Sequence, residues 1–415
     1  MPPSEATLAT AVVPPPHAPA REERLHALDN LRAWAMFLGI LLHAAIPFMQ
    51  TKFPWAARDV NTHWSFDLLV VFVHGFRLQL FFFIAGFFAR LLHERLGARV
   101  FAKHRLKRIG APFLLGMITL IPLIGALWAW GMSRMTEPME MPFQPRRGIA
   151  GIPTGHLWFL QYLLVLYALA IPVAWLLRRL PAGTYATADR AFDALLRSPF
   201  KVLVFVPPTV FCLWNGPTWG EVEQVGVNFV PPLRAVAYYG LFFSIGWWLH
   251  RRRHHLAELS RFLKSSFAVA FAAIIIHIAI MAAQPKDVQP NYQFLKVTSL
   301  SCVALYAWLM SFALTGWFLR FAGQHQTRVR YLADASYWCY LAHLPLVIWL
   351  QVIVAPWPLN GWIKFIGLNA VTMAVLLLAY DWFVRYTFLG TMLNGPRTRP
   401  IKTAPAQPSS TPPLI

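Results

Sequence analysis

Apolar runs separated by short polar segments recur along most of this chain. The run at 200–214 is the weakest, because Val-Pro-Pro at 206–208 interrupts it. Since a membrane helix needs about 20 apolar residues, the pattern predicts an all-α polytopic membrane protein with about ten transmembrane helices. The ten predicted spans are 31–50, 67–90, 111–131, 156–177, 200–214, 233–250, 266–283, 295–319, 335–355 and 361–384.

Lys and Arg residues are dense in every second loop between these spans. The segments 90–108, 178–201, 251–264 and 320–330 are rich in them, and the alternate loops hold few. Positively charged loops stay in the cytoplasm, so we expect both termini of this multi-pass membrane protein there. The net charge of +20 therefore indicates topology, and no nucleic-acid partner is expected.

The two ends of the chain differ from its apolar middle. Residues 1–24 and 386–415 are rich in Pro and small or polar residues, a composition typical of disordered tails. We expect one membrane domain over 25–385. The three cysteines, at positions 212, 302 and 339, have no metal-ligand spacing, and no metal site is predicted.

Arg32 and His43 lie on one apolar helix of the first predicted span. Eleven residues bring a helix back to within about 20° of its starting direction and advance it by about 16 Å. Both side chains should therefore share one face, with Arg32 near the cytoplasm and His43 near mid-membrane. A neutral His there can act as a general base. The same residues also fit a core His bonded to a neighbouring helix and an Arg reaching the interface.

Other polar residues in or beside the spans are candidates for the same site. Each has a structural alternative: positive-inside charge for the arginines before the third span, and an interfacial anchor for the tryptophan. Arg77 lies too deep for a surface charge, which favours a buried ion pair or a substrate contact. The candidates are His74, Arg77, Arg105, Arg108, His156, Trp158, Tyr340 and His343.

Four motifs in this order resemble acyltransferase family 3, the integral-membrane O-acyltransferases. They are Arg32 and His43 with ten residues between them, FFFIAGFF (81–88), RLKRIGAP (105–112) and SYWCYLAH (336–343). The second motif departs from the family pattern, because Ala85 stands where Ser is usual. The resemblance covers about residues 25 to 385 and agrees with a ten-span layout.

This resemblance implies roles for particular residues. His43 would be the catalytic His with Arg32 as its partner, and Arg105 and Arg108 would bind the acyl donor. Tyr340 and His343 would belong to the same cavity, and we expect His74, His156 and Trp158 to line it. HGFRLQLFFFIAGFFAR (74–90) and GHLWFLQYLLVLY (155–167) resemble the glucan-modifying branch, which is thought to succinylate osmoregulated periplasmic glucans.

The sequence therefore favours a membrane enzyme that transfers an acyl group, preferably succinyl, from cytoplasmic acyl-CoA to a hydroxyl of a periplasmic glucan or other glycan. Succinyl-CoA or acetyl-CoA would be a co-substrate, and no permanently bound cofactor is expected. His43 would deprotonate the hydroxyl or become transiently acylated. Arg77 would bind the donor, at its oxyanion or at a succinyl carboxylate. The alternative is a transporter or flippase without covalent chemistry, since a polar cavity would look similar.

Overall fold

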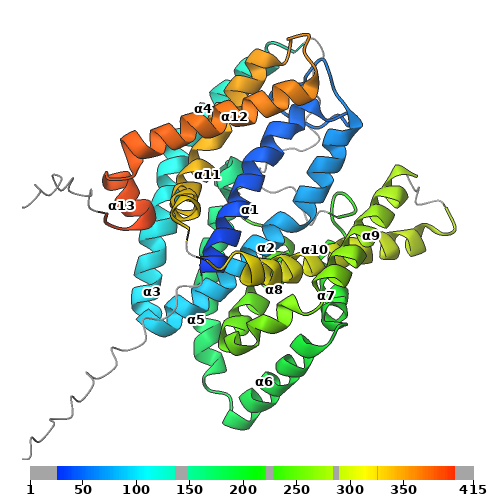
Figure 1. Cartoon of the computed structure of the whole chain (residues 1–415), viewed down its shortest axis with the longest axis vertical. Coiled ribbons are helices and arrows are strands. Elements are labelled where there is room, and N and C mark those ends of the chain that lie inside the picture. Colours follow the sequence, from blue (N-terminus) through cyan, green and yellow to red (C-terminus); the bar gives the residue numbers. More distant parts are fainter. Residues whose placement is uncertain (1–25, 136–147, 221–227, 284–288, 325, 398–415) are drawn as a thin grey trace, which may run out of the picture.

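The computed structural model describes residues 26–135, 148–220, 228–283, 289–324 and 326–397, so the predicted tail 1–24 lies outside it. All regular elements in these ranges are helical (Figure 1). The α-helices are α1 (His26–Ala45), α2 (Trp64–Leu96), α3 (Ala98–Arg105), α4 (Ala111–Met132), α5 (Trp158–Leu177), α6 (Ala182–Arg197), α7 (Val206–Leu213), α8 (Leu233–Arg251), α9 (Leu263–Ala282), α10 (Tyr292–Phe321), α11 (Thr327–Val354), α12 (Gly361–Ala379) and α13 (Phe388–Asn394).

All ten predicted spans are helical, and eight helical segments among the described residues have the length and apolar composition of a membrane span. The run at 200–214 forms a 3-10 segment and then α7, whose 8 residues rise only about 12 Å. Two prolines at 207–208 fit the first turn of α7 but not a helix interior. α8 also falls outside the eight. The all-α membrane class is confirmed, and the total of ten is not.

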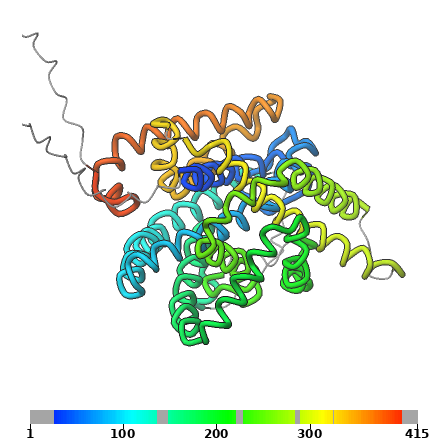
Figure 2. The backbone as a smooth tube through the Cα atoms, turned by 60° about the horizontal axis from the view of Figure 1, so that its bottom comes forward, coloured from blue at the N-terminus to red at the C-terminus, as the bar shows by residue number. Residues whose placement is uncertain are grey.

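Helix α1 lies in the middle of the bundle (Figures 1 and 2). It contacts α2, α10, α11 and α12. Its buried residues include Ala33, Ala35, Gly39 and Ala44, and small residues of this kind let neighbouring membrane helices approach closely. A polar side chain in the middle of α1 therefore meets other helices, which can supply its hydrogen bonds.

Two glycines bring α2 and α8 into backbone contact. A Cβ atom on Gly86 would collide with the carbonyl of Phe243, and one on Gly246 would collide with the carbonyl of Phe83. Glycine is the residue that permits such an approach, because it has no side chain to exclude the neighbouring backbone. The contact fixes α2, which also carries Arg77, against the rest of the bundle.

A buried ion pair fastens the loop before α2 to α12. Nζ of Lys364 lies 2.6 Å from Oδ1 of Asp59, and both side chains are only 1% exposed. Lys364 also donates to the carbonyl of Trp357 at 2.9 Å. Burial raises the pKa of Asp59, and the hydrogen bond from Lys364 opposes that rise. Each partner therefore depends on the other for its charge to be tolerated.

The chain is folded beyond the predicted end of the membrane domain. We expected disorder over 386–415, but α13 buries Leu393, and Arg397 forms an ion pair with Asp334 of α11 at 2.6 Å. The prediction was wrong up to residue 397, because the apolar residues of α13 precede the Pro-rich segment on which it was based. The rest of the predicted tail, 398–415, lies outside the described residues.

α6 is joined to the end of α8 through Asp193, which accepts hydrogen bonds from Arg252. These bonds hold the pKa of the Asp193 carboxyl below its usual range. His254 and His255 lie close enough to Asp193 to form a potential metal-ligand group. We assign no metal to this group, since Asp193 is already engaged by Arg252.

Candidate active site

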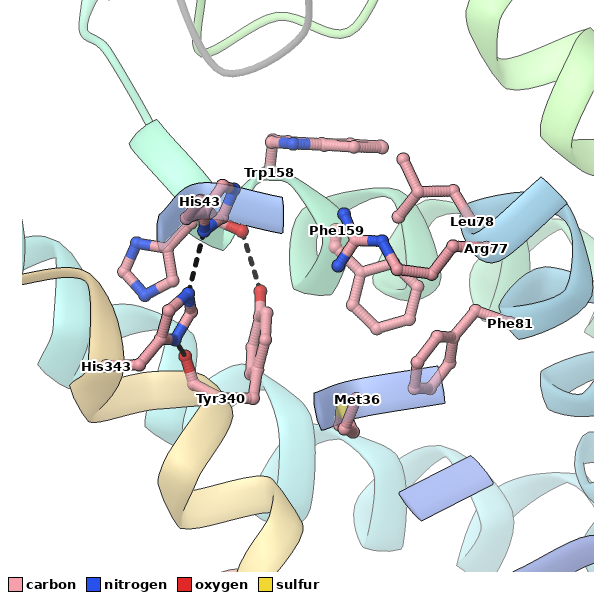
Figure 3. A pocket seen from close by; sticks show the side chains of 10 residues that line it. Met36, His43, Arg77, Leu78, Phe81, Trp158, Phe159, Tyr340 and His343 are labelled. Atoms are coloured by element: carbon pink, nitrogen blue, oxygen red, sulfur yellow. Dashed lines mark hydrogen bonds between the residues drawn. The ribbon is translucent and has the colours of Figure 1, made fainter. Parts of the chain in front are cut away.

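A pocket lies beside His43, between α1, α2, α11 and the segment that opens α5 (Figure 3). It gathers six predicted site residues from distant parts of the sequence, with apolar side chains between them. The lining residues are Met36, His43, Arg77, Leu78, Phe81, His156, Trp158, Phe159, Tyr340 and His343.

His43 and His343 share a hydrogen bond that determines where both rings carry their protons. Nδ1 of His43 lies 2.8 Å from Nε2 of His343, and Nδ1 of His343 lies 2.6 Å from the carbonyl oxygen of Tyr340. A carbonyl oxygen only accepts, so a neutral His343 carries its proton on Nδ1 and accepts at Nε2. His43 is then the donor at Nδ1. Its Nε2 keeps a lone pair that no described residue engages.

His156 and Tyr340 both bond to backbone groups. Nε2 of His156 lies 3.0 Å from the carbonyl oxygen of Leu341, and the Tyr340 hydroxyl donates to the carbonyl of His156 at 2.7 Å (Figure 3). The rings of His156 and His343 stand nearly perpendicular, with centroids 5.3 Å apart. These bonds tie the start of α5 to α11, so the pocket walls hold one another in place.

Trp55 and Gln351 fix the C-terminal end of α1. Gln351 donates to the carbonyl of His43 at 2.8 Å and accepts from the Trp55 indole at 2.9 Å. The Trp55 ring stacks on the ring of His43 with centroids 5.9 Å apart. Sequence reasoning missed both residues. A Gln inside an apolar run was a usable signal, because polar groups in membrane helices are seldom without a role.

One face of α1 runs from Arg32 near the start of the helix to His43 in the pocket. Arg32, Met36, Gly39 and His43 follow spacings of four, three and four residues, which places them along one stripe of the helix. Met36 lines the pocket, and Gly39 faces the Arg77 guanidinium. The prediction that Arg32 and His43 share a face is thus confirmed. The same spacing could have identified Met36 and Gly39.

Three arginines gather near the N-terminal end of α1, and we call Arg32, Arg105 and Arg108 the arginine cluster. Arg108 interacts electrostatically with both of the others. Arg32 pairs with Asp29 at 3.4 Å, while the Arg105 guanidinium lies over the ring of Tyr167, 4.8 Å from its centroid. Like charges held together in this way favour a ligand with several negative charges.

Arg77 belongs to the pocket and not to the arginine cluster. The sequence grouped it with Arg105 and Arg108 as a donor-binding residue, but only Arg77 lines the pocket beside His43. His74, also predicted for the cavity, lies three residues earlier on α2 and is not a lining residue. Leu78, on the same helix, does line it, and an apolar residue in an apolar run gives no signal in the sequence.

Comparison with known proteins identifies the family. The acyltransferase domain known as acyltransferase family 3 matches residues 25–381. The chain belongs to this acyltransferase family. Glucans biosynthesis protein C of Escherichia coli O139:H28 is 23% identical over 389 residues, which cover 91% of this chain and 96% of the relative. The proteins of that name from Escherichia coli O1:K1 and strain K12 are 24% and 23% identical over 394 residues, with the same coverage. No solved structure matches the chain.

The pocket gives this membrane acyltransferase the groups that acyl transfer needs. The lone pair on Nε2 of His43 can take a proton from a hydroxyl, or attack an acyl carbon itself. The bond to His343 remains available to stabilise the imidazolium that proton transfer creates. Arg77 supplies a positive charge in the same space. The site therefore combines a group that can act as a base, a hydrogen-bond partner that orients it and a cation.

Proposed function

We propose that this acyltransferase moves an acyl group, preferably succinyl, from acyl-CoA to a hydroxyl of a periplasmic glucan or other glycan. The names of its relatives support a glucan acceptor. The observation that carries the proposal is the lone pair of Nε2 on His43, held ready in the pocket by the hydrogen bond to His343. A pure transport protein has no need of a fixed tautomer at this position.

The donor would enter from the cytoplasm. We assign the protein to the bacterial inner membrane, since its relatives come from Escherichia coli. Both termini would be cytoplasmic, because Lys and Arg are dense in the corresponding loops. The arginine cluster then faces the cytoplasm, where guanidinium forks suit the phosphates of succinyl-CoA or acetyl-CoA. The acyl arm would follow the face of α1 for about 16 Å from Arg32 to His43.

His43 would act as a general base in a direct transfer. Its Nε2 takes the proton of the sugar hydroxyl while the hydroxyl oxygen forms a bond to the thioester carbon. The tetrahedral intermediate then breaks its carbon–sulfur bond, and the His43 imidazolium returns the proton to the departing thiolate. The products are a sugar ester and free CoA thiol, so no oxidant, reductant or metal enters the balance.

The test uses purified protein in detergent with succinyl-CoA and a periplasmic glucan. We expect free thiol to appear together with glucan of succinyl mass. His43→Ala should abolish both thiol release and glucan modification. His277→Ala is the control and should retain both, because His277 is a buried histidine bonded to Ser299 on α10. Normal glucan modification by His43→Ala would refute the role of this residue. Glycan movement without thiol release by the natural protein would instead favour a transporter.

A further inference from the structure

Arg77 holds a positive charge in the pocket without a negative partner. None of the ten lining residues is an Asp or Glu. Among the residues that the structure describes, no ion pair involves Arg77, and its Nε atom is buried without a hydrogen-bond partner. Two other buried cations have partners: Lys364 is paired with Asp59, and Lys201 donates to the carbonyl of Leu196. A lone cation in a membrane interior is unfavourable, so its presence in a pocket points to an anionic ligand.

Gly39 fixes the place of this charge. A Cβ atom at position 39 would collide with Nη1 of Arg77 and lie 3.3 Å from its Cζ. The guanidinium therefore rests against the backbone of α1, on the face that carries His43. The position of the guanidinium depends on glycine at position 39, since even the methyl group of alanine there would displace it.

The chemistry of the fork selects its ligand. A guanidinium binds a carboxylate through two parallel hydrogen bonds, a geometry that a single oxyanion cannot match. An acyl chain whose thioester carbon lies at His43 has its other end free within the same pocket. We propose that Arg77, seated against Gly39, binds the free carboxylate of a dicarboxylic acyl group and selects such groups over uncharged chains. This inference rests on the proposed acyl transfer from acyl-CoA.

The experiment compares two donors of equal length. Succinyl-CoA and butyryl-CoA both carry four-carbon acyl groups, and they differ in a terminal carboxylate against a methyl. For the natural protein we expect a higher kcat/KM with succinyl-CoA. Arg77→Gln should lower the ratio of the two kcat/KM values by about 10- to 100-fold, the loss expected for a charge-assisted hydrogen bond.

Two glycine variants test whether the position of the Arg77 charge matters, and not only its presence. Gly39→Ala keeps Arg77 but displaces its fork, so the donor ratio should fall here as well. Gly367→Ala on α12 is the matched control, because a Cβ atom there meets nothing within 4 Å. Its donor ratio should equal that of the natural protein.

A competition measurement needs no variant. Free succinate should inhibit butyryl transfer by the natural protein at lower concentration than succinamide does, because the diamide has the same length and no carboxylate. Equal inhibition by the acid and the amide would overturn the proposal. Equal losses with both donors in Arg77→Gln would also overturn it and would make Arg77 a group for the oxyanion. If the natural protein released thiol from no acyl-CoA at all, the proposed function would fail, and this inference would fail with it.

Discussion

Replacing His343 with Phe tests whether the tautomer of His43 matters for the reaction. His343 is 1% exposed, and its Nε2 is the acceptor for Nδ1 of His43 at 2.8 Å. Phe keeps a flat ring of similar size in this position but accepts no hydrogen bond. His43 would then be free to carry its proton on Nε2, where it cannot act as a base, and its imidazolium would lose a partner.

The size of the effect follows from that single bond. A hydrogen bond to a charged group contributes about 1.5–3 kcal/mol, and each 1.36 kcal/mol is about tenfold in rate. We therefore expect kcat of His343→Phe to fall by about 10- to 100-fold. KM for the acyl donor should change little, because the phosphates are assigned to the arginine cluster. His343→Gln offers a carbonyl oxygen as acceptor and should recover part of the rate.

The assay is thiol release with succinyl-CoA and glucan at saturating donor. His277→Phe is the control for loss of a buried His, since His277 is 8% exposed and bonds Ser299 at 2.8 Å outside the pocket. Its kcat should stay at the natural value. If His343→Phe kept full activity while remaining monodisperse, the relay from Tyr340 through His343 to His43 would have no catalytic role.

Three other changes test the fold and the mechanism. Lys364→Met leaves Asp59 as an unpaired buried carboxylate and should destabilise the protein by about 3–5 kcal/mol, measured as a lower midpoint of thermal unfolding. The double variant with Asp59→Asn should recover part of the lost stability. An unchanged midpoint in the single variant would contradict the importance of the pair. Gly246→Ala should separate α2 from α8 at the Phe83 carbonyl and lower the yield of folded protein, whereas Gly367→Ala should not. In the absence of acceptor, the natural protein should form no stoichiometric N-acyl imidazole on His43, because the proposed transfer is direct. Mass spectrometry of protein incubated with succinyl-CoA alone would detect such an adduct.

Helical periodicity made part of the site predictable. The shared face of Arg32 and His43 follows from the helical repeat, which needs no knowledge of other helices. The spacing of Tyr340 and His343 places them on one face for the same reason. By contrast, Trp55 lies in a loop whose path depends on Asp59 and Lys364, and no local rule predicts that path.

Helix length and proline placement explain why the count of ten spans is not confirmed. Apolar composition at 200–214 resembles a span, but α7 begins only at the prolines and is too short to cross a bilayer. The tail prediction was based on the Pro-rich segment that begins near residue 394, and the short apolar helix α13 precedes that segment.

The sequence by itself determined the membrane class, the helical segments and the face of α1 that carries Arg32 and His43, because these depend on local hydrophobicity and on the helical repeat. Only the tertiary structure decided which residues meet across helices. It placed Nε2 of His343 against Nδ1 of His43 and the Arg77 fork against Gly39. A hydrogen bond between residues 300 positions apart depends on how whole helices pack, and that packing fixes both the proton on His43 and the charge beside it.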